Sequence, residues 1–155
     1  MTAPDLLQMV IRHSGNQYAQ DRLTNYFSKY GISARTHAHI NIKDLTEAEA
    51  MAIHRADFYD HFKFKDLPPK LRAITYTTGI LLGFPEAFKL LSQAVQYFPV
   101  REELTADLLL KIDSINPEIS RARVGTLLVL WLSDHNLLNS NIRSLMPRVM
   151  ESVSS

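Results

Sequence analysis

The feature that most constrains this sequence is the use of proline to mark the beginnings of helices. Pro4, Pro69, Pro85 and Pro117 each stand at the start of a run whose apolar residues recur at helical spacing. Proline is tolerated in the first turn of a helix, where its missing N–H has no intrahelical partner, but it breaks a helix interior. The four prolines therefore separate helices and predict an all-α fold class.

The clearest helical pattern covers residues 45–62. Thr46 and Glu49 have the spacing of a capping box, and Leu45 and Ala50 flank it as a hydrophobic staple. The expected buried face consists of Met51, Ile53, Phe58 and Phe62. The predicted helices are residues 2–15, 18–31, 45–62, 66–83, 84–98, 105–112, 116–135 and 139–149. This pattern predicts about seven to eight helices.

Two segments lie between the first helix and the helical pattern of residues 45–62. In residues 18–31 the helical interpretation places Leu23, Tyr26, Phe27 and Tyr30 on one face and ends the helix at Gly31. Residues 32–44 alternate at Ile40 and Ile42, which favours a short extended piece.

A chain of 155 residues with 46% hydrophobic residues fits one domain, residues 1–155, with a frayed tail from about residue 151. The absence of cysteine excludes disulfides and thiolate metal sites. A net charge of +1 gives no indication of a nucleic-acid or membrane partner. The N-terminus has no signal-peptide pattern, and apolar runs such as "VGTLLVLWL" are too short for a membrane span.

Six histidines raise the question of a metal site. His54, Asp57 and His61 recur along one predicted helix, and His37-Ala-His39 forms a second cluster. Neither has the His-Glu-x-x-His spacing that places two zinc ligands and a base on adjacent turns. A solvated polar helix face is the simpler interpretation, so we expect no metal and no cofactor.

Carboxylates suited to general acid catalysis are not evident either. Glu47 and Glu49 already serve the start of a helix as cap and dipole partners. No apolar pocket that would raise the pKa of a carboxyl group is predicted around the other acids. A surface interpretation covers Asp57, Asp60, Glu102 and Glu103.

Two further groups have ordinary interpretations. His13 and Ser14 are adjacent in a helix, where neighbouring side chains do not face each other, so they form no nucleophile–base pair. A basic group is interleaved with Phe62 and Phe64 but matches no nucleic-acid-binding motif. Its members are Lys63, Lys65, Lys70 and Arg72.

Three stretches in order carry a resemblance to a known family. "YGIS" (30–33) leads into "KDLTEAEAMAIHRADFYDHF" (43–62), and "DLPPKLRAITYTTGILLGFPEAFKLLSQAV" (66–95) follows. The chain resembles glycoside hydrolase family 108 muramidases, also called secretion-activator proteins, over about residues 5–135. The positions that keep the pattern are His13, Gly15, Tyr30 to Ser33, Leu45, Thr46, Ala48 to Ala50, Ile53, Arg55, Leu67, Pro68, Gly83 and Leu91 to Ala94.

The resemblance implies a lysozyme-like helical domain and places the family's catalytic site. In the family, a glutamate within a His-Glu-Gly-Gly-Tyr type motif at the end of the first helix is the catalytic acid. Ser14 stands at the position of this glutamate, and Asn16 stands at the second glycine. Further replacements are Ser28-Lys29 for Thr-Asn, Thr77 for an aspartate, and Leu81-Leu82 for Asn-Ser.

These replacements imply a degenerate, non-catalytic member with an apolar pocket, because serine does not protonate a leaving glycosidic oxygen near neutral pH. We expect a structural or interaction module of a phage or secretion apparatus that binds a protein partner or peptidoglycan. Without a signal peptide, it would be made in the cytoplasm and then join a virion or reach the periplasm or cell wall. The expected binding residues are His13, Ser14, Gly15, Asn16, Tyr18 and Tyr30.

Two alternatives stay open. The chain is an active peptidoglycan hydrolase if another carboxylate has taken over the acid's role, with Asp21 as the first candidate and Glu47 and Asp57 as the others. If the resemblance arises only because helical proteins share capping and spacing patterns, the chain is simply an all-α interaction domain. The sequence gives no indication of the oligomeric state.

Overall fold

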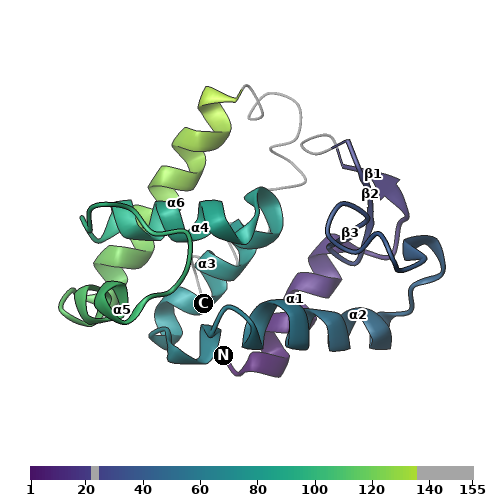
Figure 1. Cartoon of the computed structure of the whole chain (residues 1–155), viewed down its shortest axis with the longest axis horizontal. Helices are drawn as coiled ribbons and strands as arrows, with labels where there is room; N and C mark the ends of the chain where they lie inside the picture. Colours follow the sequence, from purple (N-terminus) through teal and green to yellow (C-terminus); the bar gives the residue numbers. More distant parts are fainter. Residues whose placement is uncertain (22–24, 136–155) are drawn as a thin grey trace. The chain divides into compact units, whose positions relative to one another are not determined.

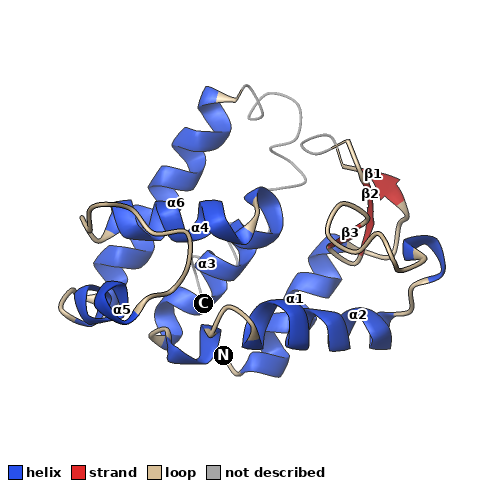
Figure 2. Ribbon diagram, in the orientation of Figure 1, coloured by secondary structure: helices blue, strands red, loops and turns tan. Residues whose placement is uncertain are grey.

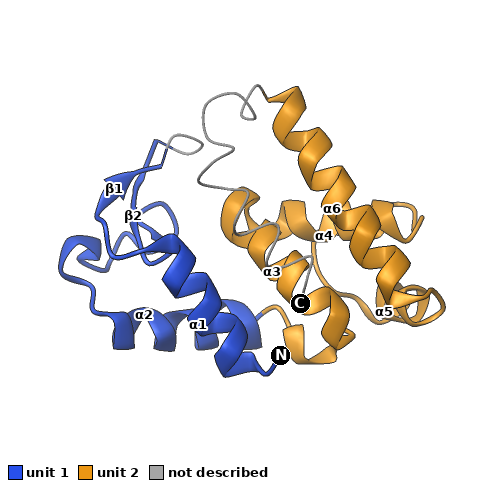
Figure 3. Ribbon diagram, turned by 180° about the vertical axis from the view of Figure 1, so that it is seen from behind, with its two compact units in different colours: residues 1–61 blue, residues 62–155 orange. Residues whose placement is uncertain are grey.

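The computed structural model describes residues 1–21 and 25–135 and is mostly helical (Figures 1 and 2). The chain forms two compact units, residues 1–61 and residues from Phe62 onward (Figure 3). The all-α class is confirmed. The expectation of one domain spanning residues 1–155 stays a prediction.

Among its described residues, the first unit contains two α-helices, one 3-10 helix, one π-helix and a small sheet. Its elements are α1 (Ala3–Ser14), β1 (Ala19–Gln20), β2 (Phe27–Lys29), β3 (Ile32–Ser33), the 3-10 helix η1 (Ile42–Asp44), α2 (Glu47–Ile53) and the π-helix η2 (His54–Asp60). The second unit contains η3 (Phe64–Asp66), α3 (Pro69–Leu82), α4 (Phe84–Ala94), α5 (Ala106–Asp113) and α6 (Pro117–Asp134).

The helix starts that the capping box at Thr46 and the four prolines predicted are confirmed. The Thr46 hydroxyl accepts from the Glu49 N–H at 3.3 Å, and the Glu49 carboxylate accepts from the Thr46 N–H at 2.8 Å. Thr2 and Asp5 form a second capping box at the start of α1. Prolines occupy the first turns of α1, α3, α4 and α6. Local capping chemistry thus fixes where the helices begin.

The helix predicted for residues 18–31 is wrong. This segment holds β1 and β2, which pair antiparallel with Gln20 opposite Phe27, and β2 pairs antiparallel with β3. Asn25 and Tyr30 have φ values of 60° and 54°, a left-handed conformation that ends a regular element. The aromatic residues between these turns suit a strand at least as well as a helix.

The described residues contain six α-helices, fewer than the seven to eight expected. The loss of the 18–31 helix accounts for one of them. The extended piece predicted at Ile40 and Ile42 is also wrong, since Ile42 begins η1 and the strand of this region is β3. The helix predicted for residues 139–149 lies outside the described residues.

The first unit packs α1 against α2 and η2. From α1 it buries Leu6, Leu7, Met9, Val10 and Ile11. The side chains that α2 and η2 turn inward are Ala50, His54, Phe58 and Tyr59. Met51, Ile53 and Phe62, which were expected to be buried, are only half-buried. Met51 and Ile53 lie in α2, before the π-helix begins at His54, and of the residues of α2 only Ala50 is fully buried.

The second unit is built on the mutual packing of α3, α4 and α6. Its central helix, α3, is buried from Ala73 to Gly79, as its apolar sequence predicts. Gly79 allows a close approach: a Cβ atom added there would lie 2.4 Å from Cδ1 of Phe84. Around this contact an aromatic cluster consists of Phe62, Phe64, Tyr76, Phe84 and Phe88.

Within the described ranges, no helix combines the length and the apolar character that crossing a lipid bilayer requires.

Candidate functional site

The end of α1 carries Ser14, the residue that the family resemblance places at the position of the catalytic acid. Ser14 is the last residue of α1, and Gly15 leaves the helix with a φ of 71° while its N–H still donates to the Ile11 carbonyl at 2.9 Å. The Tyr30 N–H donates to the Gly15 carbonyl at 3.0 Å. This bond joins the turn between β2 and β3 to the end of α1.

The hydroxyl of Ser14 is buried in this junction. Its Oγ has no hydrogen-bond partner among the described residues. A Cβ atom added to Gly31 would lie 2.9 Å from this Oγ and 3.4 Å from Cε1 and Nε2 of His54. Gly31 also has a φ of 79°, so two independent reasons favour glycine there. Ser14, Gly31 and His54 therefore pack directly together, and we call them the Ser14 junction.

His54 supports the junction as a neutral imidazole. Its ring is fully buried, and its Nε2 lies 2.7 Å from the carbonyl oxygen of Tyr30, so Nε2–H donates and the Nε2–H tautomer is present. The pKa of His54 is lowered to about 4, mainly by burial, with the Tyr30 hydrogen bond raising it and the nearby His37 lowering it. The expectation that His54 belongs to a solvated polar face is wrong.

The two histidine clusters of the sequence contact each other in the structure, but their arrangement differs from that of a metal site. The buried His37 places Nε2 2.9 Å from Oδ2 of Asp57, and its Nδ1 lies 2.9 Å from the Thr36 hydroxyl. Phe58 has edge contacts with the rings of both His37 and His54. Among the described residues, no three His, Asp or Glu side chains gather in a way that would hold a metal ion. The His37–Asp57 pair attaches the loop after β3 to η2.

The remaining predicted binding residues lie on the turn and the small sheet. Asn16 and Tyr18 are exposed, whereas His13 and Tyr30 are half-buried. The Tyr18 ring stacks on the ring of Phe27, with centroids 4.7 Å apart and planes 17° apart. Phe27 was predicted to lie on one face of a helix, but it is the first residue of β2 and is 42% exposed. Interpreting residues 27–29 as a strand would have placed Phe27 beside Tyr18.

The three alternative carboxylates lie in separate settings. Glu47 is exposed in the first turn of α2, where it accepts from Nε2 of Gln8 at 3.1 Å. Asp57 is half-exposed and accepts from His37. The backbone N–H of Asp21 donates to the Tyr26 carbonyl at 2.8 Å, next to the end of β1. Neither Glu47 nor Asp57 has the buried apolar surroundings that favour a protonated acid.

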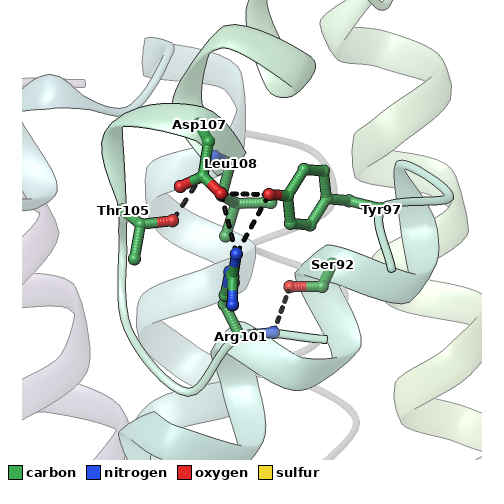
Figure 4. A network of polar contacts seen from close by, with 6 residues as sticks. All are labelled: Ser92, Tyr97, Arg101, Thr105, Asp107 and Leu108. Carbon is green, nitrogen blue, oxygen red and sulfur yellow. Dashed lines mark hydrogen bonds and ion pairs between the residues drawn. The ribbon is translucent and has the colours of Figure 1, made fainter. Parts of the chain in front are cut away.

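The second unit has a polar network whose role is structural (Figure 4). The carboxylate of Asp107 accepts from Nη2 of Arg101 at 2.8 Å and from the Tyr97 hydroxyl. Hydrogen bonds from Thr105, Tyr97 and Arg101 lower the pKa of Asp107. The backbone N–H of Arg101 donates to Ser92 Oγ at 3.0 Å. The network fixes the segment between α4 and α5 to both helices.

The replaced positions of α3 belong to the second unit. Thr77 and Leu81 are buried, with 3% and 6% exposure, and Leu82 is half-buried. The basic group also has ordinary surroundings: Arg72 donates to the carbonyls of Leu67 and Lys65, and Lys70 pairs with Glu118 at 2.9 Å. The expectation of an apolar pocket in place of a sugar cleft stays a prediction.

Comparison with known proteins finds a family whose model matches part of this chain. Residues 8–83, from within α1 to the end of α3, match the model of the family Glycosyl hydrolase 108. No curated protein matches the chain at a significant level. Among solved structures, the chain is similar to "Structure of Brucella abortus SagA", with a TM-score of 0.83 and 19% identity over 97% of this chain and 90% of that chain.

At 19% identity, this likeness shows the fold. The family match covers the Ser14 junction, the sheet and η2, so it includes the turn on which the resemblance rested. The resemblance is confirmed: residues 8–83 carry the sequence pattern of glycosyl hydrolase family 108, and the chain has a lysozyme-like helical fold.

Proposed function

We propose that this chain is a non-catalytic, muramidase-fold module that binds the glycan of peptidoglycan as a component of a phage particle or a secretion apparatus. One observation carries the proposal. The residue at the position of the family's catalytic acid is Ser14, and its hydroxyl is buried against Gly31 and His54.

The chemistry of a serine hydroxyl explains why this observation weighs against turnover. A general acid must hold a proton near the operating pH and release it to the leaving oxygen, which a serine hydroxyl does not do at neutral pH. General acid help is worth about 10²–10⁴-fold in rate, so its loss leaves a binding surface rather than an efficient hydrolase. Burial of Ser14 Oγ also keeps it away from a substrate oxygen.

The neighbours of Ser14 supply no substitute for the acid. Gly31 contributes no side chain, and His54 has a pKa of about 4, so its ring carries no extra proton at neutral pH. The Nε2–H of that ring already donates to the Tyr30 carbonyl. The junction therefore serves to hold the turn in place.

The family relationship supports peptidoglycan as the ligand class, since the part of the chain that matches a glycosyl hydrolase model is also the part that contains the turn and the sheet. Assembly into a virion or a secretion apparatus would bring such a module to the cell wall without an activity of its own.

The test uses purified chain and purified sacculi in two assays on the same samples. Sedimentation of the chain with sacculi measures binding, and the fall in turbidity of the suspension measures cleavage. We expect sedimentation with the sacculi and no clearing. Robust clearing that disappears in Asp21→Asn would overturn the proposal in favour of a relocated carboxylate, with Glu47→Gln and Asp57→Asn as parallel variants.

A second variant separates loss of the acid from loss of the whole site. Ser14→Glu restores the residue type of the family at this position. Because the junction around Gly31 and His54 is closely packed, we expect Ser14→Glu to gain no lytic activity. Active Ser14→Glu protein would show that the site has lost one group only, and that the rest of a working hydrolase is intact.

A further inference from the structure

Two aromatic rings on the small sheet of the first unit have no role in the core. Tyr18, just before β1, and Phe27, the first residue of β2, are each 42% exposed. We propose that these two rings form a stacking platform for the pyranose ring of an N-acetylated amino sugar. The inference rests on the proposed function and names the surface that would recognise the glycan.

The sheet register places the rings on one face. Gln20 pairs with Phe27 across the two strands, so their side chains project to the same side. Tyr18 precedes Gln20 by two residues and therefore projects to that side as well. The measured ring contact agrees, with centroids 4.7 Å apart and an angle of 17° between the planes. The two rings are stacked on each other on the same side of the hairpin as Gln20, so their outer faces and edges are the surfaces that a ligand can meet.

The chemistry of this face suits a neutral sugar. Aromatic rings offer flat apolar surfaces, and the Tyr18 hydroxyl adds a polar group at the edge. The exposed amides of Asn16, Gln17 and Gln20 supply uncharged donors and acceptors for hydroxyl and acetamido groups. The Gln20 amide is oriented by donation from its Nε2 to the Asn25 carbonyl at 2.8 Å. Sugar-binding sites need this combination of a planar apolar surface and convergent polar groups.

The size of the platform favours a sugar over a protein partner. A stable protein interface buries about 800 Å² on each partner, far more than two partly exposed rings and three amides provide. The platform is also continuous with the Ser14 junction, because the Tyr30 N–H at the end of β2 bonds to the Gly15 carbonyl. The sheet and the turn therefore present one rigid surface within the first unit.

The experiment is a titration of the full chain with the soluble tetramer of N-acetylglucosamine, followed by tyrosine fluorescence and by calorimetry. Tyr18→Leu and Phe27→Leu keep an apolar side chain but remove the planar ring, and we expect each to raise Kd by about fivefold to tenfold. Tyr18→Phe and Phe27→Tyr keep the rings and should stay within about twofold of the wild type. Tyr26→Leu is the matched control, since Tyr26 is 48% exposed on the same hairpin.

The outcomes separate this inference from the proposed function. If the wild type binds neither the tetramer nor sacculi, the proposed function fails. If it binds and the two leucine variants bind equally well, the platform is wrong while the module proposal stands. An equal loss in Tyr26→Leu also overturns the platform. Thermal unfolding of every variant is recorded in parallel, and a weaker Kd supports the platform only in a variant with an unchanged melting temperature.

Discussion

The two units of this chain reach a packed interior by different means. In the second unit, α3, α4 and α6 pack together, and an aromatic cluster holds Phe64 against both Phe84 and Phe88. In the first unit, the buried apolar side chains of α1 share the interior with two buried histidines, His37 and His54, which hold loops in place through hydrogen bonds. Because burial disfavours the charged form of the His54 imidazole, we expect the stability of the first unit to depend on acid, whereas the aromatic cluster contains no histidine.

This difference also separates scaffold from candidate function. An interior made of hydrogen-bonded loops keeps exposed groups such as Tyr18 at defined positions, and loops on a rigid support are where binding surfaces commonly arise. The dense helical packing of the second unit leaves little room for such variation. Substitutions in both units and a change of pH test this contrast, and the greatest loss of stability is expected in the aromatic cluster.

Phe64→Ala should have the largest effect, because it removes a fully buried ring from the centre of the aromatic cluster. Phe64 lies 5.0 Å from the Tyr76 ring and 5.8 Å from the Phe84 ring, measured between centroids. We expect the free energy of unfolding to fall by about 3–5 kcal/mol. Denaturant unfolding measures the change, and Leu110→Ala, at a 73% exposed position, should stay within about 0.5 kcal/mol.

Acid should weaken the first unit through His54. Its pKa is about 4 in the folded chain against 6.5 for an ordinary histidine, so below pH 6.5 the unfolded chain binds a proton that the folded chain does not. Stability from this group is complete above pH 6.5 and is lost as the pH falls toward 4, by about 3 kcal/mol at the lower limit.

Hydrogen exchange at individual amides measures this loss between pH 7 and pH 4. Protection of amides in the first unit should decrease more than protection of those in α3 and α4. In His54→Gln, which keeps an amide donor for the Tyr30 carbonyl, this part of the pH dependence should disappear. Equal loss of protection in both units would contradict a specific role for His54.

Gly79→Ala tests the tight contact between α3 and α4. The added methyl group would meet the Phe84 ring at 2.4 Å, so the ring must move, and we expect a loss of about 1–3 kcal/mol despite the better helix propensity of alanine. Phe84→Leu in the same chain should relieve part of the strain. If the two losses simply add, the contact is not the cause.

Ser14→Ala should have the smallest effect and the opposite sign. Its Oγ is buried without a partner, so its removal should leave the chain unchanged or more stable by up to about 1 kcal/mol. Ser92→Ala is the matched control in the second unit, since Ser92 Oγ donates to the Phe88 carbonyl and accepts from the Arg101 N–H. We expect it to cost about 1–2 kcal/mol in denaturant unfolding.

Local chemistry explains which parts of the fold were predictable. Capping residues and prolines act within one helical turn, so Thr46 with Glu49 and Pro117 with Asn116 located their helices correctly. The segment with β1 and β2 failed because Tyr26, Phe27 and Tyr30 fit a helical stripe, although aromatic residues are also common in strands. The strand pairing that decides between the two, Gln20 with Phe27 and Ser28 with Ser33, is not shown by residue types alone.

The candidate site was predictable only in part for the same reason. The turn at Ser14 was visible as a short motif, but its packing against Gly31 and His54 depends on residues far along the chain. The pairing of His37 with Asp57 likewise joins two clusters that look unrelated in sequence. Residue types identified the candidates, and tertiary contacts determined their surroundings.

The π-helix η2 has a consequence for evolutionary comparison. Such a segment accommodates one residue more than a regular helix over the same path. A homologue with an uninterrupted α-helix in this place would therefore lack a counterpart for one residue between His54 and Asp60. Deletion of a single codon there would restore a regular helix and leave the flanking residues in register, whereas one extra residue without the wider turn would rotate every following side chain by about 100°.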